Sequence, residues 1–143
     1  MRYVFSTSKT ELYRFPTHAN ELVLDRSEAT TSEVFVVVLE KGEKTHRHRH
    51  DDTEQIFYIL DGEGTLFIGE GEQPHPLRPG DLCRIPPDTV HAAAAAPNST
   101  LRYLAVDCFI GGRPSAEPTW DDHARAICRQ QGWDYSQLRN PRD

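Results

Sequence analysis

Alternating apolar and polar positions run through most of the chain, and this two-residue period is typical of β-strands. The alternation is weak over residues 1–30 and becomes strong from Ser32. Segments rich in β-branched and aromatic residues then follow at short intervals, over residues 33–43, 55–72, 80–88 and 100–109. Glycine and proline separate them, and helical patterning is scarce before residue 117. The pattern predicts an all-β fold, an antiparallel β-barrel or jelly roll.

Residues 91–97 read HAAAAAP and conflict with this pattern, because alanine is the best helix former. A run of alanines closed by Pro97 is, however, shorter than the roughly 12 residues that an isolated helix needs. We therefore expect a strand in this segment. His91, Ala93 and Ala95 would share one face of it, and the small side chains beside the histidine would leave room for a ligand.

The C-terminal tail, residues 117–143, is predicted to contain a short α-helix. Thr119 and Asp122 have the spacing of a capping box, and Gly132 is suited to end the helix. Apolar residues recur on one helical face of this segment. We expect the helix to cover the barrel from outside.

The chain of 143 residues is expected to form one domain, with an N-terminal strand segment (1–30), a barrel core (31–112) and the helical tail (117–143). Its net charge of −6 argues against nucleic acid and anionic membranes as partners. The three cysteines have no paired spacing, which favours reduced thiols. No stretch is apolar enough for a signal peptide or a membrane span, so the sequence predicts a cytoplasmic protein.

Three histidines occupy alternate positions just before an acidic patch. In an extended strand His46, His48 and His50 would point to one face, while Arg47 and Arg49 would point to the other. Converging imidazoles are costly to bury bare, and neutral imidazole is the commonest metal donor, so the cluster indicates a metal site. The alternative is a solvated basic edge strand in which the histidines have no function.

Residues 42–91 resemble the two sequence motifs of the cupin superfamily. The matching positions are Gly42, His48, His50, Gln55 and Gly62 in the first motif, and Gly80, Pro86 and His91 in the second. Asp88 stands where the family prefers glycine, Ala95 where it has asparagine, and Gln55 where it usually has glutamate. The resemblance implies a metal site formed by His48, His50, Gln55 and His91. It also implies one divalent ion per chain, of Fe, Ni, Mn, Zn, Co or Cu.

Gln55 and Glu54 compete for the fourth ligand position. Counting back from Gly62 gives Gln55 the family register, and strand alternation then turns Gln55 inward with Phe57 while Glu54 points outward. His46 shares the face of the ligands but lies about 6 to 7 Å farther along the strand. It is either a substrate contact or a surface residue at the barrel mouth. The remaining histidines, His18, His75 and His123, are expected on the surface.

Asp107 alternates onto one face with Phe109 in the last strand pattern. If that face lines the cavity, Asp107 is a carboxylate suited to general base catalysis. The alternative is an aspartate at a strand end in solvent. The spacing of Asp107, Phe109 and Arg113 resembles small cupins that linearise unsaturated uronates. This implies a proton shuttle at Asp107, a carboxylate clamp at Arg113, and a wall at Phe109 that packs against the substrate. Phe57, which faces inward with Gln55, is also expected to contact the substrate.

Together these features predict a metal-dependent enzyme with a small-molecule substrate. Four neutral ligands would leave the full +2 charge on the ion, which favours Lewis-acid catalysis of proton transfer, ring opening or isomerisation. A metal-dependent dioxygenase and a non-enzymatic binding protein are the alternatives. The resemblance also implies a homodimer, with strands from residues 1–15 exchanged between subunits.

Overall fold

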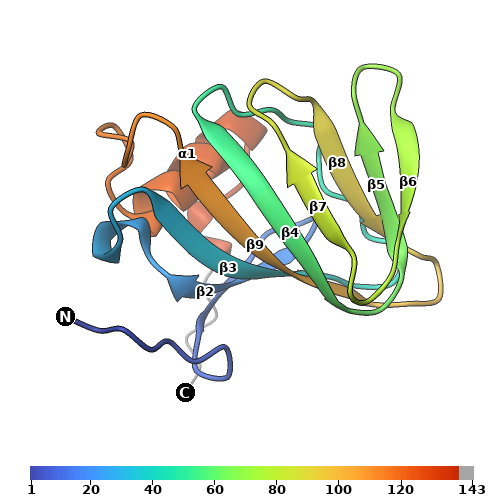
Figure 1. Cartoon of the computed structure of the whole chain (residues 1–143), viewed down its shortest axis with the longest axis horizontal. Coiled ribbons are helices and arrows are strands. Elements are labelled where there is room, and N and C mark those ends of the chain that lie inside the picture. Colours follow the sequence, from blue (N-terminus) through green and yellow to red (C-terminus); the bar gives the residue numbers. More distant parts are fainter. Residues whose placement is uncertain (139–143) are drawn as a thin grey trace.

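Two antiparallel sheets and one C-terminal helix make up the fold of residues 1–138, which are the residues that the computed structural model describes (Figure 1). The larger sheet has six strands in the order β1-β2-β3-β9-β4-β7, and the smaller has three in the order β6-β5-β8. The strands are β1 (Glu11–Arg14), β2 (Ala19–Leu24), β3 (Ser32–Leu39), β4 (Thr53–Asp61), β5 (Gly64–Ile68), β6 (Gln73–Leu77), β7 (Leu82–Ile85), β8 (His91–Ala95) and β9 (Leu101–Phe109). The predicted all-β jelly-roll class is confirmed, as two facing sheets.

The larger sheet positions its inward side chains in rows that cross several strands. One row holds Glu33 of β3, Asp107 of β9 and Gln55 of β4, and another holds Asn20 of β2 with Tyr103 of β9. Because alternate residues of a strand face the same way, each row presents its side chains to the space between the sheets. The register therefore brings polar residues from four strands to one face.

The alanine-rich segment is a strand, β8, as predicted. It pairs with β5 in the smaller sheet, and His91, Ala93 and Ala95 are all buried. The sequence did not indicate β6, whose segment contains two prolines, Pro74 and Pro76. Proline cannot donate to a strand ladder, and β6 lies at the edge of its sheet, where this costs least.

The helix α1 (Trp120–Gln131) begins and ends as the sequence predicts. Thr119 and Asp122 form the capping box, and Gly132 ends the helix in a left-handed conformation with φ of 72°. Trp120 packs against Phe35 of β3 with a ring-centroid distance of 4.7 Å. The predicted tail over 117–143 extends into residues 139–143, which lie outside the described residues.

Short 3-10 helices lie at η1 (Arg26–Glu28) and η2 (Tyr135–Gln137). The three cysteines are free, as predicted. None of the helices in residues 1–138 has the length and apolar character needed to cross a membrane.

Candidate metal centre

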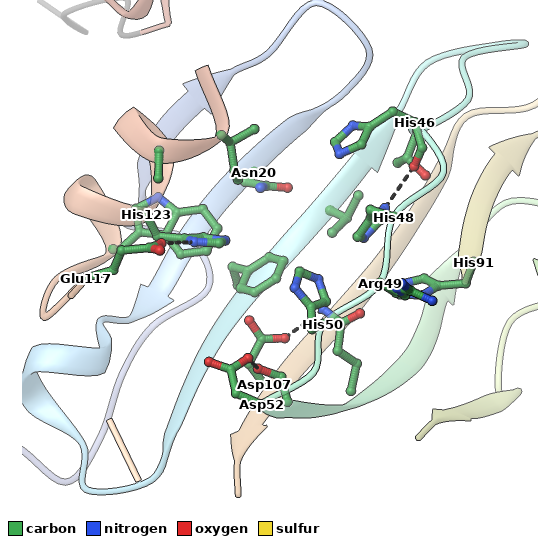
Figure 2. A pocket seen from close by; sticks show the side chains of 18 of the residues that line it. Asn20, His46, His48, Arg49, His50, Asp52, His91, Asp107, Glu117 and His123 are labelled. Carbon is green, nitrogen blue, oxygen red and sulfur yellow. Dashed lines mark hydrogen bonds and ion pairs between the residues drawn. The ribbon is translucent and has the colours of Figure 1, made fainter. Parts of the chain in front are cut away.

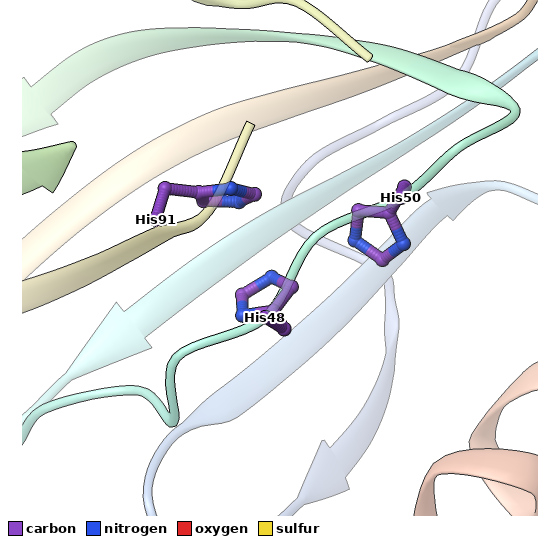
Figure 3. Close-up of side chains that lie close together, drawn as sticks. All are labelled: His48, His50 and His91. Carbon is purple, nitrogen blue, oxygen red and sulfur yellow. The ribbon is translucent and has the colours of Figure 1, made fainter. Parts of the chain in front are cut away.

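Three histidines converge between the two sheets, from the segment after β3 and from β8. One ring nitrogen each from His48, His50 and His91 lies within 4.8 Å of the others (Figure 3). The Nδ1 atoms of His48 and His91 are 2.8 Å from the carbonyl oxygens of His46 and Thr89. A carbonyl only accepts, so these Nδ1 atoms carry the proton and each Nε2 keeps its lone pair. The arrangement is that of metal-ligating imidazoles fixed by backbone contacts.

The backbone explains why these rings meet. His48 and His91 form an antiparallel bridge, in which each backbone N–H donates to the other's carbonyl at 3.1 and 2.9 Å. The carbonyl of His50 accepts from the N–H of Asp88, which has a φ of 59°. Asp88 thus takes up the left-handed backbone that the family achieves with glycine. Residues 46–50 do not form the regular strand that the sequence predicts, because only His48 makes a bridge.

Gln55 supplies an oxygen to the same region. Its Nε2 donates to Asp107 Oδ1 at 2.8 Å, while its Oε1 is buried and has no hydrogen-bond partner among residues 1–138. The contact with Asp107 fixes which end of the amide faces the histidines. Glu54 points away, as alternation predicts, and pairs with Arg84 at 2.9 Å. Three imidazole nitrogens and one amide oxygen form a donor set that fits a divalent transition metal.

Asp107 lies at the centre of a buried polar network. It is 6% exposed, so the alternative of a strand-end aspartate in solvent is wrong. Burial raises the pKa of Asp107 well above its ordinary value, and the neighbouring Glu33 raises it further. Glu33 in turn pairs with Arg26 through two contacts of 2.7 Å. This network fixes the orientation of the Gln55 amide through its hydrogen bond to Asp107.

Burial also keeps the ligand histidines neutral. It is the largest cause that lowers the pKa of His50 to about 4 and the pKa of His48 well below its ordinary value, and neighbouring histidines lower both further. Burial likewise lowers the pKa of His91. The imidazoles can therefore act as donors near neutral pH without first losing a proton.

A cavity of about 310 Å³ opens beside the histidines, within the size range of small-molecule sites (Figure 2). The predicted contacts His46, Phe57 and Phe109 line it. Arg113 does not. It is exposed, and its Nη2 donates to the carbonyl of Ala29 at 2.5 Å. The structure thus brings together the predicted site residues except Arg113.

Two histidines predicted on the surface also line this cavity. His18 is 8% exposed, and His123 of α1 pairs with Glu117, with 2.5 Å between Nδ1 and Oε1. His75 is exposed, as expected. The sequence predicted the helix but carried no signal for which residues of α1, or of the segment around β2, meet the cavity. Asn20 and Trp120, which also line it, were missed for this reason.

The chain belongs to the Cupin domain family, which matches residues 35–107, just over half of its length. An oxalate-binding protein of Thermotoga maritima is 34% identical over 68 residues, which are 48% of this chain and 54% of that protein. The chain spans about half the length of the curated relatives it matches.

Two solved structures share the fold. The polyketide cyclase RemF of Streptomyces resistomycificus has a TM-score of 0.68 at 20% identity, covering 80% of this chain and 83% of that one. KdgF of Halomonas sp. has a TM-score of 0.59 at 24% identity, covering 73% and 94%. At these identities the likeness establishes the fold and not the activity.

Proposed function

We propose that this cupin is a metal-dependent enzyme that catalyses proton transfer, ring opening or isomerisation on a small oxygenated substrate. The observation that carries the proposal is the meeting of the three imidazoles beside a cavity that Gln55 also lines. His48, His50, His91 and Gln55 would hold one divalent ion. Such an ion would supply Lewis acidity and polarise a carbonyl or hydroxyl oxygen of the substrate.

The chain offers two groups for moving a proton. Asp107 is buried and its Oδ1 accepts from Gln55 Nε2, which suits a residue that positions Gln55. His123 is held at Nδ1 by Glu117, and this leaves Nε2 as the ring atom available to a substrate. The rings of His123 and His50 lie 6.5 Å apart between centroids. We therefore assign proton transfer to His123 and orientation of its ring to Glu117.

The relatives agree with an oxygenated substrate. One is described as a polyketide cyclase and another as an oxalate-binding protein, and polyketides and oxalate are both rich in oxygen. Uronates are less well supported, because their carboxylate was assigned to Arg113, which lies outside the cavity.

The test begins with elemental analysis of protein purified without added metal and again after loading. One divalent ion per chain is expected. Hydrogen–deuterium exchange into enolisable ketones, followed by NMR with and without oxygen, then separates the reactions. Exchange that does not need oxygen supports the proposal, and oxygen consumption indicates a dioxygenase. A chain that binds a ketone but never exchanges its protons would be a binding protein, and one that takes up no ion would contradict the metal site.

We also propose a homodimer. The larger sheet exposes Tyr58, Leu60 and Leu82 on its outer face, with Tyr58 directly opposite Leu82 in the register. At the N-terminus, Tyr3 and Val4 are also exposed, and this end extends away from the sheets (Figure 1). Sedimentation equilibrium should show a dimer that Leu82→Lys weakens. A wild-type monomer would contradict this assignment. The cytoplasmic location stays a prediction.

A further inference from the structure

Five buried side-chain atoms have no hydrogen-bond partner in the part of the chain that the structure describes, and all five belong to residues that line the cavity. Two of them, His91 Nε2 and Gln55 Oε1, belong to the metal centre. The other three are Asn20 Oδ1, His46 Nδ1 and Trp120 Nε1. An unsatisfied buried polar atom costs about 1 to 3 kcal/mol, so three in one cavity need a common explanation.

Asn20 and Trp120 come from β2 and α1, whereas His46 lies beside the ligand histidine His48, with 4.8 Å between the ring centroids. Figure 2 shows the amide of Asn20 on β2 directed into the cavity, with His46 opposite it beside His48. Asn20 is 4% exposed and Trp120 is 1% exposed. Asn20 and Trp120 both lie outside residues 35–107, the part that matches the family. His46, by contrast, lies within the matched residues.

From these positions we infer that Asn20, His46 and Trp120 form a second recognition subsite, which binds the uncharged, hydroxyl- or carbonyl-bearing far end of a cyclic substrate. The inference rests on the proposed function, because the near end of that substrate would be held at the metal centre. Asn20 Oδ1 can only accept, and so suits a hydroxyl. Trp120 Nε1 can only donate, and so suits a carbonyl or hydroxyl oxygen.

The charges around the cavity support an uncharged ligand end. Arg26 is committed to Glu33 and to the carbonyl of Glu117, at 3.0 Å. Arg113 is committed to Ala29. The cation that remains among the lining residues is Arg49, which is exposed and adjoins the metal ligands in sequence. A buried carboxylate near Asn20 would have no such partner, and burying an unpaired charge is costly.

The walls of the cavity favour a ring. Phe35, Phe57 and Tyr103 line it, and the rings of Phe57 and Tyr103 lie 4.6 Å apart between centroids. Trp120 stacks at a tilt on Phe35. Flat aromatic faces with a few polar atoms between them bind planar oxygenated molecules well.

The test uses zinc-loaded protein and three naphthalene probes, measured by isothermal titration calorimetry. The first is an ortho-acetyl naphthol with a second hydroxyl on its far ring. The second lacks that far hydroxyl, and the third carries a carboxylate in place of it. We expect Asn20→Leu to weaken the first probe about tenfold and to leave the second within twofold. Asn98→Leu, on an exposed turn, is the matched control.

Trp120→Phe provides an independent arm, because it removes the N–H and keeps a ring at that position. It should lower the affinity for the first probe about fivefold. The melting temperature and zinc content of the variant are measured as controls.

Equal losses of affinity for the first and second probes, or no loss with either variant, would overturn the subsite. Preferred binding of the carboxylate probe that Arg49→Gln abolishes would overturn the uncharged ligand. If the protein binds no zinc, the proposed metal centre is wrong. Asn20-dependent binding of the first probe to metal-free protein would then still support the subsite. If none of the probes binds, the subsite is wrong.

Discussion

The two walls of the cavity differ in origin and in chemistry. The first, formed by residues 46–50 with β4 and β8, lies within the family-matching residues and carries the imidazoles and Gln55. The second, formed by β2 and α1, lies outside them and carries single hydrogen-bonding groups among aromatic rings. We propose that the first wall holds the metal ion, while the second wall binds the far end of the substrate and supplies His123 for proton transfer.

The walls also differ in how their polar atoms are held. On the first wall, His48 and His91 are fixed through Nδ1 by backbone carbonyls, and Gln55 is fixed by Asp107. On the second wall, Asn20 and Trp120 each have a buried polar atom that finds no hydrogen-bond partner in the described part of the chain. Changes on the first wall should therefore act mainly on metal affinity, and changes at Asn20 and Trp120 mainly on ligand affinity.

The largest effect is expected from His91→Ala on the first wall. It removes a ligand that is fixed at Nδ1 and leaves two imidazoles and one amide oxygen. Metal affinity should fall by at least about a hundredfold, measured by competition with a chelator. His75→Ala, a histidine exposed on β6, should change nothing. Stoichiometric metal at unchanged affinity in the His91 variant would break the division between the two walls.

Replacing Asp107 tests whether its hydrogen bond with Gln55 supports metal binding on the first wall. Asp107 accepts from Gln55 through Oδ1 and also neighbours Glu33, and an asparagine can imitate this arrangement by accepting from Gln55 and donating to Glu33. Asp107→Asn should therefore keep metal affinity within about threefold, whereas Asp107→Ala should lower it about ten- to a hundredfold. The same loss in both variants would mean that the carboxylate charge matters and not the orientation of Gln55.

The sequence predicted the first wall well, because its information is local. Alternation placed Gln55 inward and Glu54 outward, and the motif spacing placed His48, His50 and His91 together. Thr119 and Asp122 likewise marked the start of α1 through a short-range capping interaction. These features depend on neighbours in sequence, or on a family pattern that already contains the long-range contact.

The second wall was not predictable in the same way. His18, Asn20 and His123 reach the cavity because of how β2 and α1 pack, and no period in the sequence reports that packing. Arg113 lies outside the cavity for a different reason. The strand β9 ends at Phe109, and Gly112 turns the chain with a φ of 83°, so alternation no longer relates Arg113 to Asp107.

The buried His18, beside β2, should make the stability of the fold depend on pH. Burial is the largest cause that lowers the pKa of His18 to about 3, with His46 and Arg14 lowering it further and Glu43 opposing them. The unfolded chain takes up this proton near pH 6.5 and the folded chain does not. Stability is therefore complete above that pH and is lost as the pH falls toward the folded value.

His18→Phe keeps a ring against Phe15 and removes the titration. Between pH 7 and pH 4.5, metal-free wild type should lose about 2 to 3 kcal/mol more unfolding free energy than this variant, measured by urea denaturation. The ligand histidines titrate in both proteins, so their contribution cancels. Parallel losses in the two proteins would show that His18 is protonated in the fold, or is less buried than its place on the second wall requires.

The smallest effect is expected from Arg113→Ala, which tests a residue that belongs to neither wall. Its guanidinium contacts the carbonyl of Ala29 at the surface, so its removal should cost less than about 1 kcal/mol of stability. Binding of the naphthalene carboxylate to zinc-loaded protein should stay within about twofold, because no part of Arg113 lines the cavity. A loss of tenfold or more, confined to the carboxylate and absent for the acetyl naphthol, would show that Arg113 leaves Ala29 to bind the ligand. The region after β9 would then form a third wall, and substrate selection could no longer be assigned to β2 and α1 alone.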